Sequence, residues 1–198
     1  MSQPIDFTAH DFHPVVQLPK NYDVLDLSIP ASARPARSSQ FSIGRYNELR
    51  PDTYTEPLFA EGRTVHLGID IGAPAGTAVY AFADGWIEHF GYNSAPGDYG
   101  NTLVTGHRLD SYEIYALHGH LDGGSICGIE QGQKIRRGEV LAHLGEPHEN
   151  GGWPPHLHFQ LSWQRPTKAD LPGVVTLQDR EAALRRYPDP RLVLGPLY

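Results

Sequence analysis

The chain has 198 residues and a formal net charge of −7 at pH 7, and 39% of its residues are hydrophobic. This length favours one domain with a sizeable core, and an acidic balance without any Lys/Arg run argues against nucleic-acid and anionic-membrane partners. Cys127 is the single cysteine, which excludes an internal disulfide and a thiolate zinc cage. Any bound metal must therefore be held by His, Asp or Glu.

The N-terminal region predicts an irregular extension over residues 1–60, packed on the domain, because prolines interrupt any long element there. Residues 1–10 contain neither a basic n-region nor an apolar h-region, so we expect no secretory signal and a cytoplasmic location. The alternation in Asp23–Ile29 predicts one strand. The polar segment Gly44–Arg50 is either a solvated turn or a segment at a site mouth that presents Arg45, Tyr46 or Glu48.

The middle of the chain alternates short β-rich runs with Gly, Asp or Asn turns. This pattern predicts a mostly β fold, an antiparallel sheet arranged as a barrel-like sandwich. The expected strands are Ala78–Phe82, Trp86–Phe90, Thr102–Thr105, Tyr112–Leu117 and Glu139–Leu144. One short C-terminal helix is expected over Leu177–Tyr187, where Glu181 and Arg185 form an i,i+4 pair.

Two distant stretches carry residues suited to zinc. His156 and His158 would share one face of a strand, roughly 6.6 Å apart. His66 and Asp70 would lie roughly 13 Å apart on a straight strand, too far for one metal. Gly68 between them can bend or bulge the chain. We therefore predict a mononuclear zinc site assembled from both stretches.

A second His-x-His pair, His118 and His120, adds further candidates, for which structural and functional roles stay equally open. A hydrolytic zinc needs three protein ligands, an open position for water and a neighbouring base. Three ligands and two helpers can be drawn from His66, Asp70, His120, His156 and His158. That number suits a catalytic site better than a closed structural one.

The order His66-Leu-Gly-Ile-Asp70, Tyr115-Ala-Leu-His-Gly-His120-Leu and His156-Leu-His158 resembles the lysostaphin-type, or M23, zinc metallopeptidases. The resemblance covers about residues 63–161 and implies a β fold of the duplicated hybrid motif type, with the core at 61–165 and a C-terminal extension at 166–198. It implies one zinc ion per chain with His66, Asp70 and His158 as ligands. His120 and His156 would be the catalytic residues that flank a metal-activated water.

The resemblance also implies a zinc metalloendopeptidase acting on peptidoglycan-type or related small peptides. The loop Gly145–Pro155 is longer than in many members of the family, so Glu146 and three of its neighbours are expected to affect substrate choice. The expected substrate contacts are Arg45, Tyr46, His148, Glu149 and Trp153. One alternative is a non-hydrolytic zinc-binding regulatory or recognition module of the same fold. Another, a phosphohistidine at His66, lacks the second histidine about 15 residues upstream, where Pro51 stands.

Overall fold

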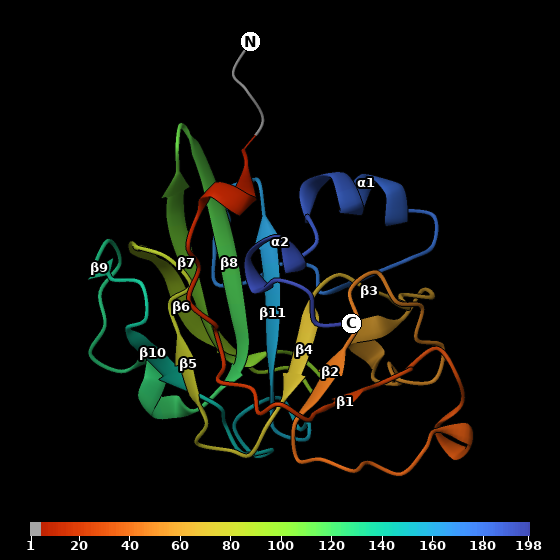
Figure 1. The fold of residues 1–198 in the computed structure, drawn as a ribbon. Helices are drawn as coiled ribbons and strands as arrows, with labels where there is room; N and C mark the ends of the chain where they lie inside the picture. Colours follow the sequence, from red (N-terminus) through yellow and green to blue (C-terminus); the bar gives the residue numbers. More distant parts are fainter. Residues whose placement is uncertain (1–4) are drawn as a thin grey trace.

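The computed structural model describes residues 5–198, so the first four residues of the predicted N-terminal extension lie outside it. An eight-stranded sheet forms the centre of the molecule, and two two-stranded sheets lie beside it (Figure 1). In spatial order the large sheet contains β1 (Asp23–Val24), β2 (Ser42–Gly44), β4 (Ile69–Gly72), β11 (His156–Ser162), β8 (Tyr112–Leu121), β7 (Gly100–Leu109), β6 (Gly85–Asn93) and β9 (Lys134–Ile135). The small sheets pair β10 (Val140–His143) with β5 (Ala78–Tyr80) and β12 (Val174–Val175) with β3 (Val65–His66).

The prediction of a mostly β fold is confirmed, whereas barrel closure is not. Strands β1 and β9 are separate edges of the large sheet, and all of its neighbours pair antiparallel except β1 and β2. Two α-helices are found within residues 5–198, where one was expected: α1 (Arg180–Arg186) and α2 (Arg191–Leu194). Because α2 is a single turn that follows Pro190, it has no hydrophobic periodicity from which it could be predicted. Short 3-10 turns occur at Phe7–Ala9, Ala31–Ala33, Pro57–Phe59 and Gly123–Ile126.

The N-terminal region contributes two strands to the large sheet. The strand expected over Asp23–Ile29 ends at Val24, and the chain then leaves the sheet. Strand β2 pairs with β4 so that Gly44 stands beside Asp70. Residues ahead of the predicted core therefore reach the predicted metal site, although the expected boundaries at residues 60 and 165 stay predictions.

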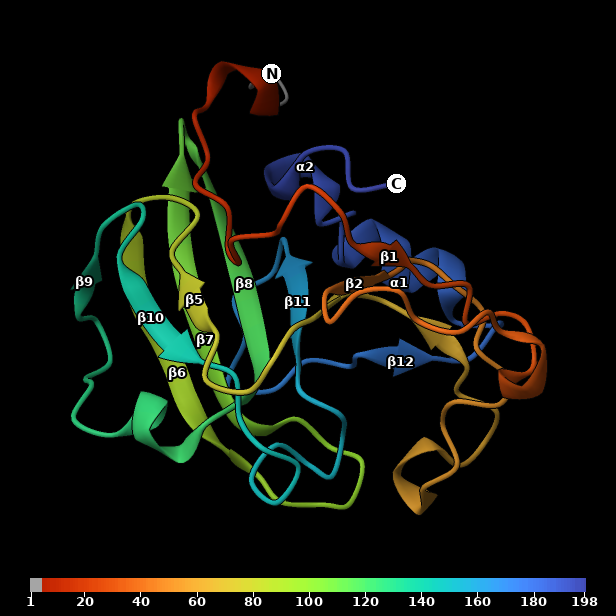
Figure 2. The same ribbon diagram turned by 60° about the horizontal axis from the view of Figure 1, so that its bottom comes forward.

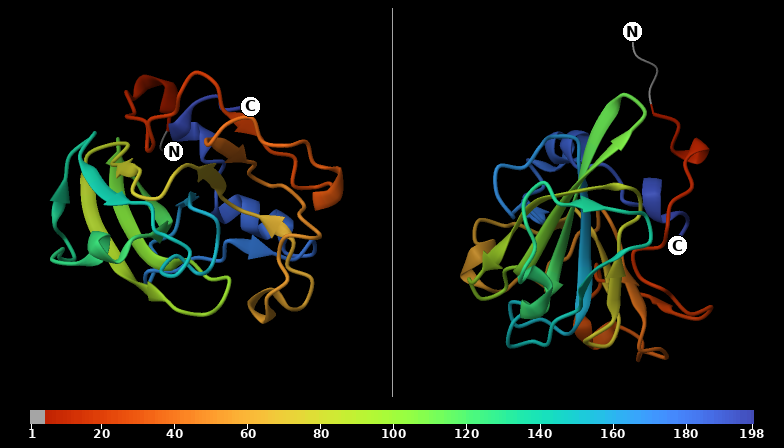
Figure 3. Two further views of the ribbon diagram at one scale, coloured as in Figure 1. Left: turned by 90° about the horizontal axis from the view of Figure 1, so that it is seen from below. Right: turned by 90° about the vertical axis from the view of Figure 1, so that its left-hand side faces the viewer.

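The long strands separate two apolar clusters, which lie on opposite faces of the sheet. Leu157, Phe159 and Leu161 of β11 point into the larger cluster, which also contains Val15 and Val193. A smaller cluster on the other face includes residues of α1. Figure 3 shows α1 on one side of the long strands and the N-terminal segment on the other. Because side chains alternate along a strand, His156 and His158 lie on the face of the smaller cluster.

Within residues 5–198, no helix combines the length and the apolar character needed to cross a bilayer.

Two core histidines predict an acid-sensitive fold. Burial lowers the pKa of His107 to about 4 and that of His118 to about 3. In the unfolded chain both take up a proton near pH 6.5. The unfolded state then binds more protons than the folded state. The contribution of the two histidines to the free energy of unfolding is therefore fully present above pH 6.5 and is lost as the pH drops towards 4, by about 3 kcal/mol for His107.

Urea unfolding of chelator-treated protein at several pH values measures this loss. His107→Gln keeps groups that can bond Asp84 and Thr105, the present partners of the ring, and should flatten the pH dependence. His143→Gln, at an exposed position, should leave it unchanged. Equal pH slopes for wild type and His107→Gln would contradict this account.

Candidate metal centre

A bend in the backbone between β3 and β4 brings His66 and Asp70 together. Strand β3 pairs with β12, whereas β4 pairs with β2 and β11, so the backbone changes sheets at Leu67-Gly68. His66 Nε2 consequently lies 3.2 Å from Asp70 Oδ1, far closer than a straight strand allows. The chain thus bends at Gly68, where the sequence predicted a bend or a bulge.

The second half of the centre comes from strand register. His158 stands opposite Asp70 on β4 and opposite Gly119 on β8, and Gly44 of β2 is the next residue in the same row. The glycines at both ends of this row make room for neighbouring side chains, because a Cβ on Gly119 would lie 2.7 Å from the Tyr99 ring and one on Gly44 would lie 2.8 Å from Arg50 Nη2. His156 lies two residues earlier on the same face, as the His-x-His spacing predicted.

Three lone pairs converge at this point without a proton between them. His66 Nδ1 donates to the carbonyl of Arg45, and His158 Nε2 donates to the side-chain oxygen of Gln160. In the neutral imidazoles, His66 Nε2 and His158 Nδ1 are therefore both acceptors, yet they lie 3.1 Å apart. Each also lies close to Asp70 Oδ1, at 3.2 and 3.1 Å. Such an arrangement is favourable only around a cation.

The spacing of these atoms fits zinc. Three ligands about 2.0–2.1 Å from a metal and 3.1–3.2 Å from one another subtend about 100° at it, near the tetrahedral angle. Two imidazoles and one carboxylate are also a common set of three protein ligands that leaves a fourth position open. His66, Asp70 and His158 thus form a group placed for a metal ion.

The fit depends on the absence of a side chain at Gly68. A Cβ at this position would lie 2.5 Å from Cε1 and 2.6 Å from Nε2 of His158. We expect Gly68→Ala to displace the His158 ring from Gln160 and to lower zinc affinity at least 10-fold, measured by competition with a chromophoric chelator. Gly91→Ala is the matched control, because the nearest atom to its Cβ would lie 3.6 Å away. Unchanged zinc affinity in Gly68→Ala would show that the ring position is not critical.

His120 and His156 lie next to the triad with one ring nitrogen each held by the backbone. His120 Nδ1 donates to the carbonyl of Asn150 at 2.7 Å, and His156 Nδ1 donates to that of Pro154 at 2.8 Å. Their ring centroids are 4.3 Å apart, and His156 Nε2 lies 3.8 Å from Asp70 Oδ1. Both Nε2 atoms are consequently acceptors in the neutral rings.

Backbone strain at His120 marks the same place. Its φ of 67° lies in the left-handed region, which is costly for a residue other than glycine, and its N–H donates to the carbonyl of Tyr99. A register shift between β7 and β8, at Asn101/Leu103, occurs next to it. The two features turn the His120 ring out of the regular alternation of β8 and towards His156.

The electrostatics favour the neutral form of His66, His120 and His156 and the charged form of the Asp70 carboxylate. Burial, and next the charge of Arg50, lower the pKa of His66 to about 4. Burial also lowers the pKa of His120 and of His156. Burial alone would raise the pKa of Asp70, but the positive charge of Arg50, bonded to its other oxygen, holds it well below its usual range. These are the protonation states in which imidazole and carboxylate bind a metal.

A cavity of about 440 Å³ opens above the triad, and it contains only one of the five predicted substrate contacts. Trp153 lines it, with its indole N–H donating to the carbonyl of Gly97. Tyr54, Phe59 and Trp153 form an aromatic wall, with ring centroids 4.7–6.4 Å apart. The segment carrying Phe59 projects beside the sheet in Figure 2, below β12. His120 and His156 line the cavity together with the triad.

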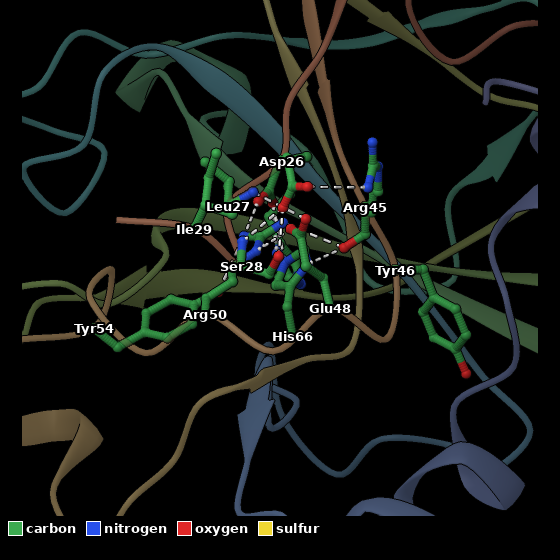
Figure 4. A network of polar contacts seen from close by, with 12 residues as sticks. Asp26, Leu27, Ser28, Ile29, Arg45, Tyr46, Glu48, Arg50, Tyr54 and His66 are labelled. Carbon is green, nitrogen blue, oxygen red and sulfur yellow. Dashed lines mark hydrogen bonds and ion pairs between the residues drawn. The ribbon is translucent and has the colours of Figure 1, made fainter. Parts of the chain in front are cut away.

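The other four predicted contacts do not line the cavity. Arg45 directs its guanidinium to Asp26 (Figure 4). The Tyr46 hydroxyl donates to the Tyr187 carbonyl. His148 is exposed and does not line the cavity, whereas Glu149 accepts the N–H of Gly123 and so anchors its loop. Local polarity indicated a site near these segments but could not give the direction of each side chain.

Several residues that support the site were missed in the sequence. Arg50 and Tyr54 precede the motifs, and Gln160 and Asn150 serve the histidines through single hydrogen bonds. Gln160 stands two residues after His158 on the same strand face, a spacing that would have suggested it. Arg50, 20 residues before its partner Asp70, offers no comparable signal.

Comparison with known proteins gives one family and a set of partial relatives. The model of Peptidase family M23 matches residues 64–170. A DD-carboxypeptidase/endopeptidase, Mpg, of Neisseria meningitidis is 38% identical over 96 residues, 48% of this chain and 20% of that protein. An L-Ala–D-Glu endopeptidase of Bacillus subtilis is 33% identical over 105 residues, 50% of this chain and 30% of that protein. The chain therefore spans about a fifth to a third of the length of these relatives.

Among solved structures, the catalytic domain of lysostaphin from Staphylococcus simulans aligns with a TM-score of 0.48 at 19% identity. The alignment covers 70% of this chain and 90% of that one. The catalytic domain of the prophage-encoded protein EnpA from Enterococcus faecalis aligns with a TM-score of 0.46 at 23% identity, over 72% and 92% of the two chains.

Proposed function

Because this chain belongs to peptidase family M23, we propose that it is a zinc metalloendopeptidase that hydrolyses amide bonds in peptidoglycan-type or related small peptides. His66, Asp70 and His158 hold one zinc ion, and His120 and His156 are the catalytic residues. One observation carries the proposal: three lone pairs converge within 3.2 Å of one another beside two neutral imidazoles with free Nε2 atoms. The relatives named as endopeptidases support the reaction class.

The residues divide the work of hydrolysis between them. Zinc, when bound, supplies Lewis-acid polarisation of the scissile carbonyl and lowers the pKa of water to about 7. His120 accepts a proton at Nε2 from the attacking water, while the Asn150 carbonyl on Nδ1 holds the ring in place and stabilises the imidazolium. His120 then returns this proton to the nitrogen of the departing amine, while neutral His156, which faces it, orients the water by accepting a hydrogen bond at Nε2.

The substrate extends over the cavity that contains the triad. The aromatic wall of the cavity supplies apolar surface, and the half-buried Asp98 that also lines it supplies polar surface. Peptide substrates of the size of a peptidoglycan stem fit such a site, because a few polar groups fix the backbone while the wall contacts side chains. The cytoplasmic location expected from the N-terminal sequence stays a prediction.

A non-hydrolytic zinc-binding module of the same fold is the competing proposal. A module that only binds zinc needs the three ligands, but it does not need His120 and His156 to activate water. The strained backbone of His120 disfavours this alternative, since such strain is costly and is characteristically retained at functional sites.

Digestion of peptidoglycan fragments and synthetic stem peptides by zinc-loaded protein, read by mass spectrometry, tests the proposal. We expect new amine and carboxylate termini at one amide bond, produced by wild type and absent after treatment with a chelator. Stoichiometric zinc without cleavage of any of these peptides would favour the binding module instead.

A further inference from the structure

A buried arginine contacts the carboxylate of the metal centre from behind. Arg50 is 2% exposed, and its Nη1 donates to Oδ2 of Asp70 at 2.6 Å. The other oxygen, Oδ1, is the one that faces His66 and His158. We infer that Arg50 is a positioning residue that restricts Asp70 to binding zinc through Oδ1 alone and so keeps a coordination position open. This role rests on the proposed metal centre.

The guanidinium is held rigidly enough to impose an orientation. Its Nε donates to Glu48 Oε2 at 2.8 Å, its Nη1 also to the Tyr54 hydroxyl, and its Nη2 to the carbonyl of Arg45. Glu48 is itself fixed, because Oε1 accepts the N–H of Leu27. Figure 4 shows Arg50 and Glu48 side by side within this network. A planar group bonded on every side cannot rotate, so it fixes the carboxylate that it contacts.

The charges of the network suit a cation site. Arg50 and Glu48 have side chains that are 2% and 6% exposed, so both charges are shielded from water. An isolated buried guanidinium beside a zinc ion would repel it. The carboxylate of Glu48 offsets that charge, so the pair orients Asp70 while adding no net charge next to the metal.

The consequence for catalysis follows from the open position. A carboxylate with two free oxygens can occupy two coordination positions, whereas a hydrolytic zinc needs one for water or substrate. Because Oδ2 is already bonded to Arg50, Asp70 offers one oxygen only. Groups of this kind, which bond a ligand without touching the metal, commonly affect metal affinity 10–100-fold.

The residues that build this support lie outside the part of the chain matched to the family, which begins at residue 64. They come from the segment after β2, where Gly44 makes room for them. A Cβ on Gly44 would lie 2.8 Å from Arg50 Nη2 and 3.2 Å from Asp70 Cβ. The polar segment ahead of the motifs therefore supports the proposed metal centre through its arginine and glutamate.

Zinc affinity and cobalt spectroscopy of three variants test the role. Arg50→Gln leaves the buried charge of Glu48 without its countercharge, which is expected to destabilise the fold. The key variant is therefore Glu48→Gln combined with Arg50→Gln, which removes both charges. We expect it to fold and to bind zinc 10–100-fold more weakly, measured by competition with a chromophoric chelator. With Co²⁺ in place of zinc, its visible absorption should weaken, as happens when coordination rises above four. Arg50→Lys should also bind zinc more weakly than the wild type, because lysine keeps the charge but lacks the planar guanidinium that bonds Asp70, Glu48 and Tyr54 together.

Arg165→Gln is the matched control. Its Nε donates to buried Glu88 at 2.7 Å, and neither residue lines the cavity. It should leave zinc affinity and the cobalt spectrum unchanged. If the double variant melts lower but binds zinc with wild-type affinity and spectrum, Arg50 serves only the fold and the inference is overturned. If the wild type binds no zinc, the proposed metal centre itself is overturned, a result that the variants cannot imitate.

Discussion

Asp70→Asn is expected to lower zinc affinity by more than about 100-fold, because a direct ligand contributes more than the 10–100-fold of an outer partner. Asparagine has the size of aspartate, and its oxygen can still accept the Arg50 hydrogen bond, so the fold should survive. What is lost is the charge between His66 and His158. Hydrolysis should fall to background, as it should in wild type after chelation, and added zinc should restore only the wild type.

Zinc titration and peptide cleavage, measured on the same preparations, check this result. Asp98→Asn is the control for metal binding: this carboxylate lines the same cavity, but its Oδ1 accepts the N–H of Tyr99 and it lies outside the triad. Its zinc affinity should stay within about 2-fold of wild type, well below the 10–100-fold that outer partners contribute. A comparable loss in both variants would mean that cavity charge, and not ligation by Asp70, attracts the metal.

Residue type and spacing predicted a zinc site among five residues, and the resemblance to the M23 family selected His66, Asp70 and His158 from them as the ligands. His156 and His158 need only the alternation of a strand to share a face, and Gly68 supplies the bend that a straight strand lacks. The existence of most strands was equally accessible, since apolar runs end at glycine and aspartate turns. Strand order was not, because it depends on pairings between segments far apart in the chain, such as β2 with β4 and β11 with β8.

The supporting residues were not predictable, for a physical reason. Arg50 acts through a single contact to Asp70 that exists only once β2 and β4 are paired. The sequence left open whether the segment around it is a solvated turn or lies at the site. It lies beside Asp70, yet Arg45 and Tyr46 turn away and Arg50 turns inward. Side-chain direction in a loop depends on backbone dihedrals that no periodic pattern reports. The polar composition therefore drew attention to the segment but did not identify Arg50 as the residue that contacts Asp70.

His120→Asn is expected to keep zinc and to lower kcat by about 10²–10⁴-fold, the usual contribution of a positioned general base. Asparagine is chosen because it tolerates the left-handed backbone at this position, where φ is 67°, far better than alanine does. A loss of rate then reports the missing imidazole and not a relaxed turn. Zinc content and kcat should be measured together, with KM expected to change little.

Combining His120→Asn with His156→Gln tests whether the two histidines act in the same catalytic step or in two separate steps. The rings lie 4.3 Å apart, so both Nε2 atoms can accept hydrogen bonds from one water. When two residues act in one step, the effects of their substitutions on the activation free energy do not add. The double variant should then have a kcat only slightly below that of the slower single variant. Multiplying losses would instead assign the two histidines to separate steps. Loss of zinc in His120→Asn would make His120 a ligand and would invalidate the division between holding the metal and moving the proton.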